Sequence, residues 1–165
     1  GQPGDLTKMI NEDWDAVVDT NLKGTFLVAR AALGPMRAAG RGRVVCVSSI
    51  SGTLGTARQS AYCAAKWGVI GFTKSLAEEL RGTGLAAISV LPGSVDTRMA
   101  AHVEGWKETP ATIAKVGLRA IRKEIDEVDT DVMAVEVRAH QARDPKGLEE
   151  QMRRALGRDR VSTGR

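Results

Sequence analysis

The feature of this sequence that most restricts its fold is a pair of short apolar runs on either side of one helical pattern. Residues 43–48 and 85–91 are apolar and β-branched almost without a break, as strands covered on both faces are. Between them, residues 49–60 are rich in Ser, Gly and Thr and are typical of a loop, and residues 61–80 have helical spacing. Strand, helix and strand in this order predict a right-handed βαβ crossover, the unit of a parallel α/β sheet.

Further elements are predicted on both sides of this unit. Over residues 11–40, apolar side chains recur at three- and four-residue steps and predict one long helix, which Gly24 and Pro35 weaken locally. Downstream, residues 111–124 predict a helix, and residues 131–138 have the alternating apolar character of a strand. Residues 145–156 predict an amphipathic helix, and we expect residues 157–165 to form a basic mobile tail.

Composition excludes several classes of function. The 24 Lys and Arg residues are spread among 20 Asp and Glu residues, and only 4% of the chain is aromatic, so we expect no nucleic-acid partner. No apolar run reaches about 18 residues, so we expect no membrane span. Cys46 and Cys63 lack the spacing of metal ligands and are expected to be small buried thiols, which favours a reduced, cytoplasmic location and no metal site.

One pair of residues suggests acid/base chemistry. Tyr62, the only tyrosine, precedes Lys66 by four residues, which places both side chains on one face of the predicted helix. An ammonium beside a phenol favours the phenolate, so Lys66 is expected to lower a tyrosine pKa that is otherwise about 10. Such a tyrosine can give a proton to a carbonyl that is being reduced or take one from an alcohol. The alternative interpretation is that Tyr62 simply snorkels beside an exposed Lys66 and the pair has no chemical role.

Other polar residues are predicted to reach the same edge of the sheet. Ser49 ends the first strand at the carboxyl edge where open parallel sheets bind ligands, and Ser48 is the alternative, since strand alternation sends one of the two inward. The turn at residues 92–97 ends the second strand and is either a polar ligand site or simply a common Pro-Gly turn. Asn21 lies inside the long helix, where Asn has poor propensity, and is either functional or plainly exposed.

Four segments, in this order and spacing, resemble the short-chain dehydrogenase/reductase family. They are WDAVVDTNLKGTF at residues 14–26, GRVVCVSSISG at 42–52, AYCAAKWGVIGFTKSLAEEL at 61–80 and LPGSVDTRM at 91–99. The resemblance implies a Rossmann-like, doubly wound parallel sheet, of which this chain supplies the C-terminal part only. It also implies hydride transfer between NAD or NADP and a small alcohol or carbonyl substrate.

The same resemblance implies a role for each residue of the motifs. Tyr62 would be the acid/base, Ser49 would orient the substrate oxygen, and Lys66 would depress the tyrosine pKa and hold the nicotinamide ribose. Asn21 would sustain a water-linked proton relay to Lys66. The implied cofactor contacts are Tyr62, Lys66, Pro92, Gly93, Val95 and Thr97. The family's long helices, here 11–39 and 61–81, also imply a homodimer or homotetramer.

The sequence departs from the family pattern at its beginning. The family's TGxxxGxG turn and its later Asn-Asn-Ala-Gly turn are both absent, so the pyrophosphate has no candidate cradle. We therefore expect residues 1–156 to be the C-terminal portion of one Rossmann-like oxidoreductase domain and the 165-residue chain to be inactive alone. The alternative is a non-catalytic fragment or an oligomerisation module built from the long helices.

Overall fold

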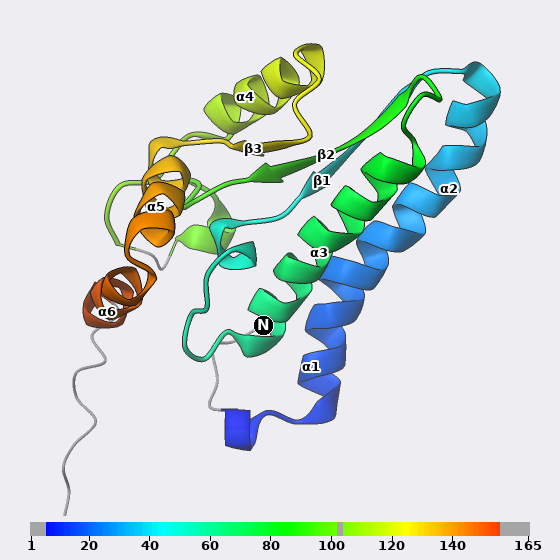
Figure 1. The fold of residues 1–165 in the computed structure, drawn as a ribbon. Coiled ribbons are helices and arrows are strands. Elements are labelled where there is room, and N and C mark those ends of the chain that lie inside the picture. The colour runs from blue at the N-terminus through cyan, green and yellow to red at the C-terminus, as the bar shows by residue number, and fades with distance from the viewer. Residues whose placement is uncertain (1–5, 102–103, 156–165) are drawn as a thin grey trace, which may run out of the picture.

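The central feature of the structure is a parallel three-stranded sheet with the strand order β1-β2-β3 (Figure 1). This computed structural model describes residues 6–101 and 104–155. Strand β1 covers Gly42–Val47, β2 covers Leu85–Leu91 and β3 covers Glu127–Asp129. Gly42 pairs with Leu85 and Val47 with Val90, and β3 joins β2 from Ser89 onward. The predicted α/β fold and its βαβ crossover are confirmed.

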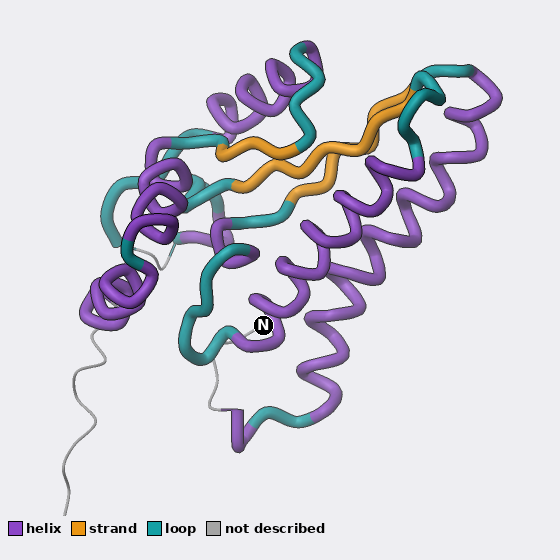
Figure 2. Tube along the Cα trace, viewed as in Figure 1, coloured by secondary structure: helices purple, strands orange, loops and turns teal. Residues whose placement is uncertain are grey.

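Helices cover both faces of this sheet (Figures 1 and 2). On one face, helix α1 (Asn11–Val18) continues through a π-helical turn (Asp19–Lys23) into α2 (Gly24–Ala39), beside which runs α3 (Ser60–Glu79). Helix α4 (Pro110–Arg122) covers the other face. Near the carboxyl ends of the strands lie α5 (Val132–Arg143) and α6 (Pro145–Ala155). Three short 3-10 helices complete the order, at Leu6–Lys8, Ile50–Gly52 and Arg98–Ala100.

The main apolar core lies between the sheet and the helix pair α2 and α3. It joins Ala29 of α2 and Leu76 of α3 to Leu80, Leu85 and Ala87. Each fully buried leucine contributes about 1.5–3 kcal/mol to the free energy of unfolding. This packing explains why the sequence forms a long helix pair there, because only the helix face with apolar residues at three- and four-residue steps can reach β1 and β2.

The prediction of a strand over residues 131–138 is wrong. Asp131 has extended backbone, and its carboxylate accepts a hydrogen bond from the backbone N–H of Ala134, so it caps α5. The third strand lies just before it, at Glu127–Asp129. Val132 and Val135 stand three residues apart on the exposed surface of α5, which fits a helix, whereas Val135 and Val137 stand two apart, which fits a strand. The predicted tail, residues 157–165, lies outside the described residues.

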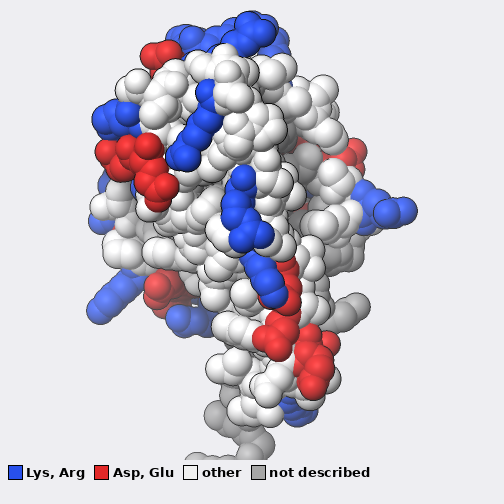
Figure 3. All heavy atoms as spheres, turned by 90° about the vertical axis from the view of Figure 1, so that its right-hand side faces the viewer, with Lys and Arg blue, Asp and Glu red and all other residues white. Residues whose placement is uncertain are grey.

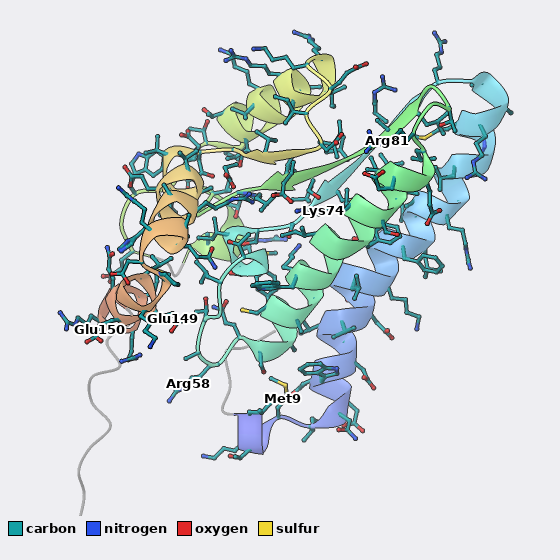
Figure 4. The ribbon with its side chains drawn as sticks, in the orientation of Figure 1. Met9, Arg58, Lys74, Arg81, Glu149 and Glu150 are labelled. Atoms are coloured by element: carbon teal, nitrogen blue, oxygen red, sulfur yellow. The ribbon has the colours of Figure 1, made fainter. Side chains whose placement is uncertain are left out.

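Ion pairs attach α5 and α3 to the short strand β3. Lys74 of α3, labelled in Figure 4, lies 3.2 Å from the Glu127 carboxylate, and Arg138 of α5 lies 2.7 Å from the same residue. Arg138 also lies 3.3 Å from Asp129. These contacts hold the middle of α5 beside β3.

Strand β1 has a neighbour on one side only among the described residues. Between its free side and α2 lies an open groove of about 440 Å³, lined mainly by apolar residues that include Ala32, Met36 and Val45. At the same groove Val28 is 71% exposed and Val47 is 57% exposed. An apolar strand with an open edge is a surface to which another strand can pair.

Candidate active site

Two chain segments meet at the carboxyl edge of the sheet. The backbone N–H of Ser48, just after β1, donates to the carbonyl of Val90 at 2.9 Å, and the N–H of Ile50 donates to the carbonyl of Pro92 at 3.0 Å. These bonds place the serine pair after β1 directly beside the Pro-Gly turn after β2. The predicted meeting of these residues at one edge is therefore present in the structure.

The two adjacent serines point to different partners. Ser48 is buried, and its hydroxyl donates to the backbone carbonyl of Lys66 at 2.9 Å. The Ser49 hydroxyl accepts a bond from the N–H of Ser51 at 3.2 Å and lies close enough to the Tyr62 side chain to lower its pKa. Ser48 thus anchors the loop to α3, and Ser49 is the serine that meets the tyrosine.

Tyr62 stands in the first turn of α3, and its pKa is raised above the ordinary value of 10.0. Burial of the phenol is the largest cause, the hydrogen bond from Ser49 opposes it, and the neighbouring Cys63 raises the pKa further. The direction is opposite to the lowering expected from Lys66. In this structure Tyr62 is a neutral phenol at neutral pH, which is the form able to donate a proton.

Lys66 lies one turn further along α3, above the ring of Tyr62 rather than at its hydroxyl. Its ammonium nitrogen is 5.5 Å from the ring centroid and donates to the carbonyl of Val47 at 3.0 Å. Burial lowers the pKa of Lys66. This position explains the difference from the sequence prediction, because an ammonium bonded to the end of β1 does not offset the burial of the phenol.

Asn21 lies in the π-helical turn between α1 and α2. The side-chain amide of Asn21 donates to the carbonyl of Val17 at 2.9 Å, and its backbone carbonyl accepts from the hydroxyl of Thr25 at 2.7 Å. A Cβ added at Gly68 of α3 would come within 2.7 Å of the Leu22 side chain, so this turn packs closely on the helix that carries Lys66. Single π-helical turns inside α-helices are frequent at functional sites. No local sequence signal identified this turn beyond the low helix propensity of Asn.

The predicted cofactor contacts divide into two groups. Pro92 and Gly93 lie at the sheet edge beside the segment that holds Ser49. Val95 forms an isolated bridge with Glu108, and the exposed Thr97 donates its hydroxyl to the carbonyl of Val95 at 3.3 Å. Sequence reasoning missed Asp131, whose carboxylate accepts the N–H of Gly93 at 2.7 Å. An Asp before an apolar run is a sequence signal for a helix cap, but no local signal marks its bond to Gly93.

The described part of the chain contains neither a membrane-spanning helix nor a cluster of metal-binding side chains. None of its helices combines the length and the apolar character that crossing a bilayer requires. Within the same residues, no three His, Cys, Asp or Glu side chains are grouped so as to hold a metal ion.

The fold and the site define a class of protein: a Rossmann-like α/β protein with Ser, Tyr and Lys at the carboxyl edge of its parallel sheet. The chain belongs to the short chain dehydrogenase family, whose sequence profile matches residues 1–108. A solved short chain dehydrogenase from Burkholderia cenocepacia, in complex with NADP, is similar in structure, with a TM-score of 0.81 and 26% identity. That similarity covers 89% of this chain and 62% of the other.

Curated relatives give the same family. The 3-oxoacyl-acyl-carrier-protein reductase FabG of Vibrio cholerae is 40% identical over 111 residues, which are 67% of this chain and 45% of the relative. The (3R)-3-hydroxyacyl-CoA dehydrogenase of Mus musculus is 46% identical over 95 residues, 57% of this chain and 37% of the relative. The matched part of the chain thus spans less than half the length of these curated relatives.

Proposed function

We propose that the full-length protein that carries this chain is a cytoplasmic NAD- or NADP-dependent oxidoreductase of the short-chain type. It interconverts an alcohol and a carbonyl compound. The observation that carries the proposal is that the Ser49 side chain, which lowers the pKa of Tyr62, lies beside this phenol, with Lys66 one helical turn away. The NADP complex of the Burkholderia cenocepacia relative supports the choice of cofactor.

The residues of this chain fit one end of the cofactor. The Lys66 ammonium has three donors, and its bond to the Val47 carbonyl leaves capacity for ribose hydroxyls. Pro92 and Gly93 lie beside the serine segment, where a nicotinamide ring would face the substrate. When bound, a reduced nicotinamide supplies the hydride that reaches the carbonyl carbon. No glycine-rich turn in this sequence fits the pyrophosphate end.

The protein's own groups handle the substrate oxygen and its proton. The Ser49 hydroxyl donates a hydrogen bond to the carbonyl oxygen and orients it toward Tyr62. As negative charge develops on that oxygen, the Tyr62 hydroxyl transfers its proton there and becomes a phenolate. Lys66, whose ammonium lies 5.5 Å from the centroid of the Tyr62 ring, is the cation that would stabilise the phenolate, and Asn21 would belong to the relay that returns a proton through water. In alcohol oxidation the same proton moves in reverse.

The remainder of the cofactor site belongs to polypeptide that packs against β1. The open apolar groove beside β1 is where an added strand would continue the parallel sheet. The relatives' additional length supports this assignment, since more than half of each lies outside the match. Residues 1–156 are then the C-terminal portion of one larger Rossmann-like domain.

Oligomerisation is proposed through the helices at residues 11–39 and 61–81. The exposed side of this helix pair carries Phe26, Leu27 and Trp67, which are 40%, 41% and 53% exposed. Figure 3 shows a broad area of uncharged side chains between separated charged ones on this side of the molecule. Apolar helix surfaces of this kind fit a homodimer or homotetramer.

A second candidate function is a non-catalytic fragment or oligomerisation module, and the same exposed apolar surfaces favour it. The two are separated by titrating NADH and NADPH into the full-length protein and into the 165-residue chain while following fluorescence. We expect binding by the full-length protein and none by the chain alone. Tight binding by the chain would contradict the incomplete site, and no binding by either would favour the module.

As an activity assay, the full-length protein is supplied with NADPH and a 3-oxoacyl-acyl-carrier-protein thioester, because the name of the Vibrio cholerae relative gives a 3-oxoacyl-acyl-carrier-protein as its substrate. Oxidation of NADPH that requires the thioester would support the oxidoreductase. Other carbonyl compounds are then compared in the same assay to define the substrate class.

A further inference from the structure

One peptide unit of the proposed site is held from both sides. The carbonyl of Pro92 accepts the N–H of Ile50, the residue after Ser49, at 3.0 Å. The N–H of Gly93 donates to a carboxylate oxygen of Asp131 at 2.7 Å. This carbonyl and this N–H belong to the same peptide plane and point in opposite directions, so the two bonds together fix the orientation of the plane. Residues that are distant in sequence provide the two partners.

Asp131 is built into this position. Its side chain is buried, with 7% exposure, and it accepts two further bonds, from the N–H of Ala134 at 2.9 Å and the hydroxyl of Thr130 at 3.3 Å. A Cβ added at Gly93 would lie 2.8 Å from one oxygen of Asp131. The absence of a side chain at residue 93 is therefore what allows the carboxylate to approach the turn.

We infer that Asp131 is a positioning residue of the active site, which sets the Pro92 to Gly93 peptide for contact with the nicotinamide end of the cofactor. The inference rests on the proposed function. Because Asp131 is also the first capping group of α5, it makes the geometry of the turn depend on how the start of α5 is seated. A carboxylate bond to a backbone N–H is among the stronger hydrogen bonds in proteins, so its loss leaves the turn held from one side only.

Two variants separate positioning from simple helix capping. Asp131→Ser keeps an oxygen that can cap α5 by accepting the N–H of Ala134. One short hydroxyl cannot at the same time accept the N–H of Gly93. Thr109→Ala is the matched control, because the Thr109 hydroxyl caps α4 through the N–H of Thr112 at 3.1 Å and has no bond to the turn. In the full-length protein we expect Asp131→Ser to weaken cofactor affinity about ten-fold, the effect of losing one charge-assisted bond, with a smaller change in kcat. Thr109→Ala should leave the cofactor affinity unchanged.

Amide hydrogen exchange at Gly93, measured by NMR on the same proteins, reports the bond itself. Exchange should accelerate in Asp131→Ser and stay as in the wild type in Thr109→Ala. Equal cofactor affinity in wild type and Asp131→Ser, with faster exchange at Gly93, would overturn the positioning role. An equal loss of affinity in both variants would also overturn it, because the cause would then be general destabilisation.

Failure of the proposed function has a different signature. A wild-type protein that binds neither NADH nor NADPH removes the proposed function, whatever the exchange at Gly93 shows. If Asp131→Ser does not fold, Asp131→Asn replaces it. Asparagine is an equally good cap of the same shape, and because Ala134 and Gly93 donate to different oxygens of Asp131, its one carbonyl oxygen replaces only one of these acceptors. The same shift in cofactor affinity relative to Thr109→Ala is then expected.

Discussion

At the scale of single residues, the site depends on which of two adjacent hydroxyls meets the tyrosine. Strand alternation predicts that Ser48 and Ser49 face opposite ways, and it leaves open which one faces the site. The structure gives Ser48 to the backbone of α3 and Ser49 to Tyr62. Replacing each serine separately therefore tests the assignment of roles.

We expect Ser49→Ala to lower the kcat of the full-length protein by about 10²-fold or more, the usual scale for a group that takes part in proton transfer. Tyr62→Phe should abolish turnover and leave folding intact, since only one hydroxyl is lost. Ser48→Ala is the matched control and should act on stability, with a loss of about 1–3 kcal/mol, because the carbonyl of Lys66 loses its buried partner. A larger loss of kcat in Ser48→Ala than in Ser49→Ala would reverse the assignment.

The ionisation of Tyr62 can be followed directly, because it is the only tyrosine of the chain. Burial favours the neutral phenol, so the tyrosinate absorbance of the folded protein should rise with a midpoint above 10.0. Folding favours the neutral form of Tyr62, which sets the sign of the effect on stability. The stabilisation is complete at pH values below the pKa of Tyr62 in the unfolded chain, and it is lost as the pH rises through the pKa of Tyr62 in the folded protein. Removing the opposing hydrogen bond with Ser49→Ala should move the midpoint higher. A midpoint below 10.0 would show that Lys66 outweighs burial.

At the scale of elements, the sequence predicted the βαβ unit well and the region after it poorly. Continuous apolar strands and a long helical period specify β1, α3 and β2 without reference to the rest of the molecule. The strand prediction for residues 131–138 failed because three valines at mixed spacing fit both the helical and the strand period. The cap of α5 that decides between them depends on a hydrogen bond from Ala134 to Asp131. The pairing of Asp131 with Gly93 spans 38 residues and has no local signature.

The loop between β1 and α3 is predicted to be sensitive to one added methyl group. A Cβ at Gly52 would lie 2.9 Å from the backbone carbonyl of Lys66, and the backbone cannot easily move away. Gly52→Ala should therefore lower the free energy of unfolding by about 1–3 kcal/mol, measured by denaturant titration. Gly55→Ala in the same loop is the control, since nothing lies within 4 Å of its added Cβ. Equal effects of the two substitutions would show that the loop does not pack against α3 in this way.

At the scale of the whole molecule, the open side of β1 governs the behaviour of the isolated chain. Its apolar groove and free strand edge should drive self-association, which light scattering measures. Val47→Lys places a charge on this edge and should reduce the association. Val132→Lys, on the exposed surface of α5, is the control and should leave it unchanged. Unchanged association in Val47→Lys would show that the chain self-associates through another surface, and the exposed side of the helix pair α2 and α3 would be the next surface to test.

The π-helical turn between α1 and α2 has a consequence for the helix on either side of it. A π turn holds one residue more than the α-helical turn it replaces, and each residue advances an α-helix by about 100° around its axis. If the same residues formed regular α-helix throughout, the side chains of α1 would rotate by about a quarter of a circle relative to those of α2, and Trp14 would leave the face on which it now sits. The π-helical turn takes up one residue locally, so α1 and α2 both keep their packing faces. Deleting a single residue from Asp19–Lys23 should therefore give one regular helix and leave α1 in its present orientation.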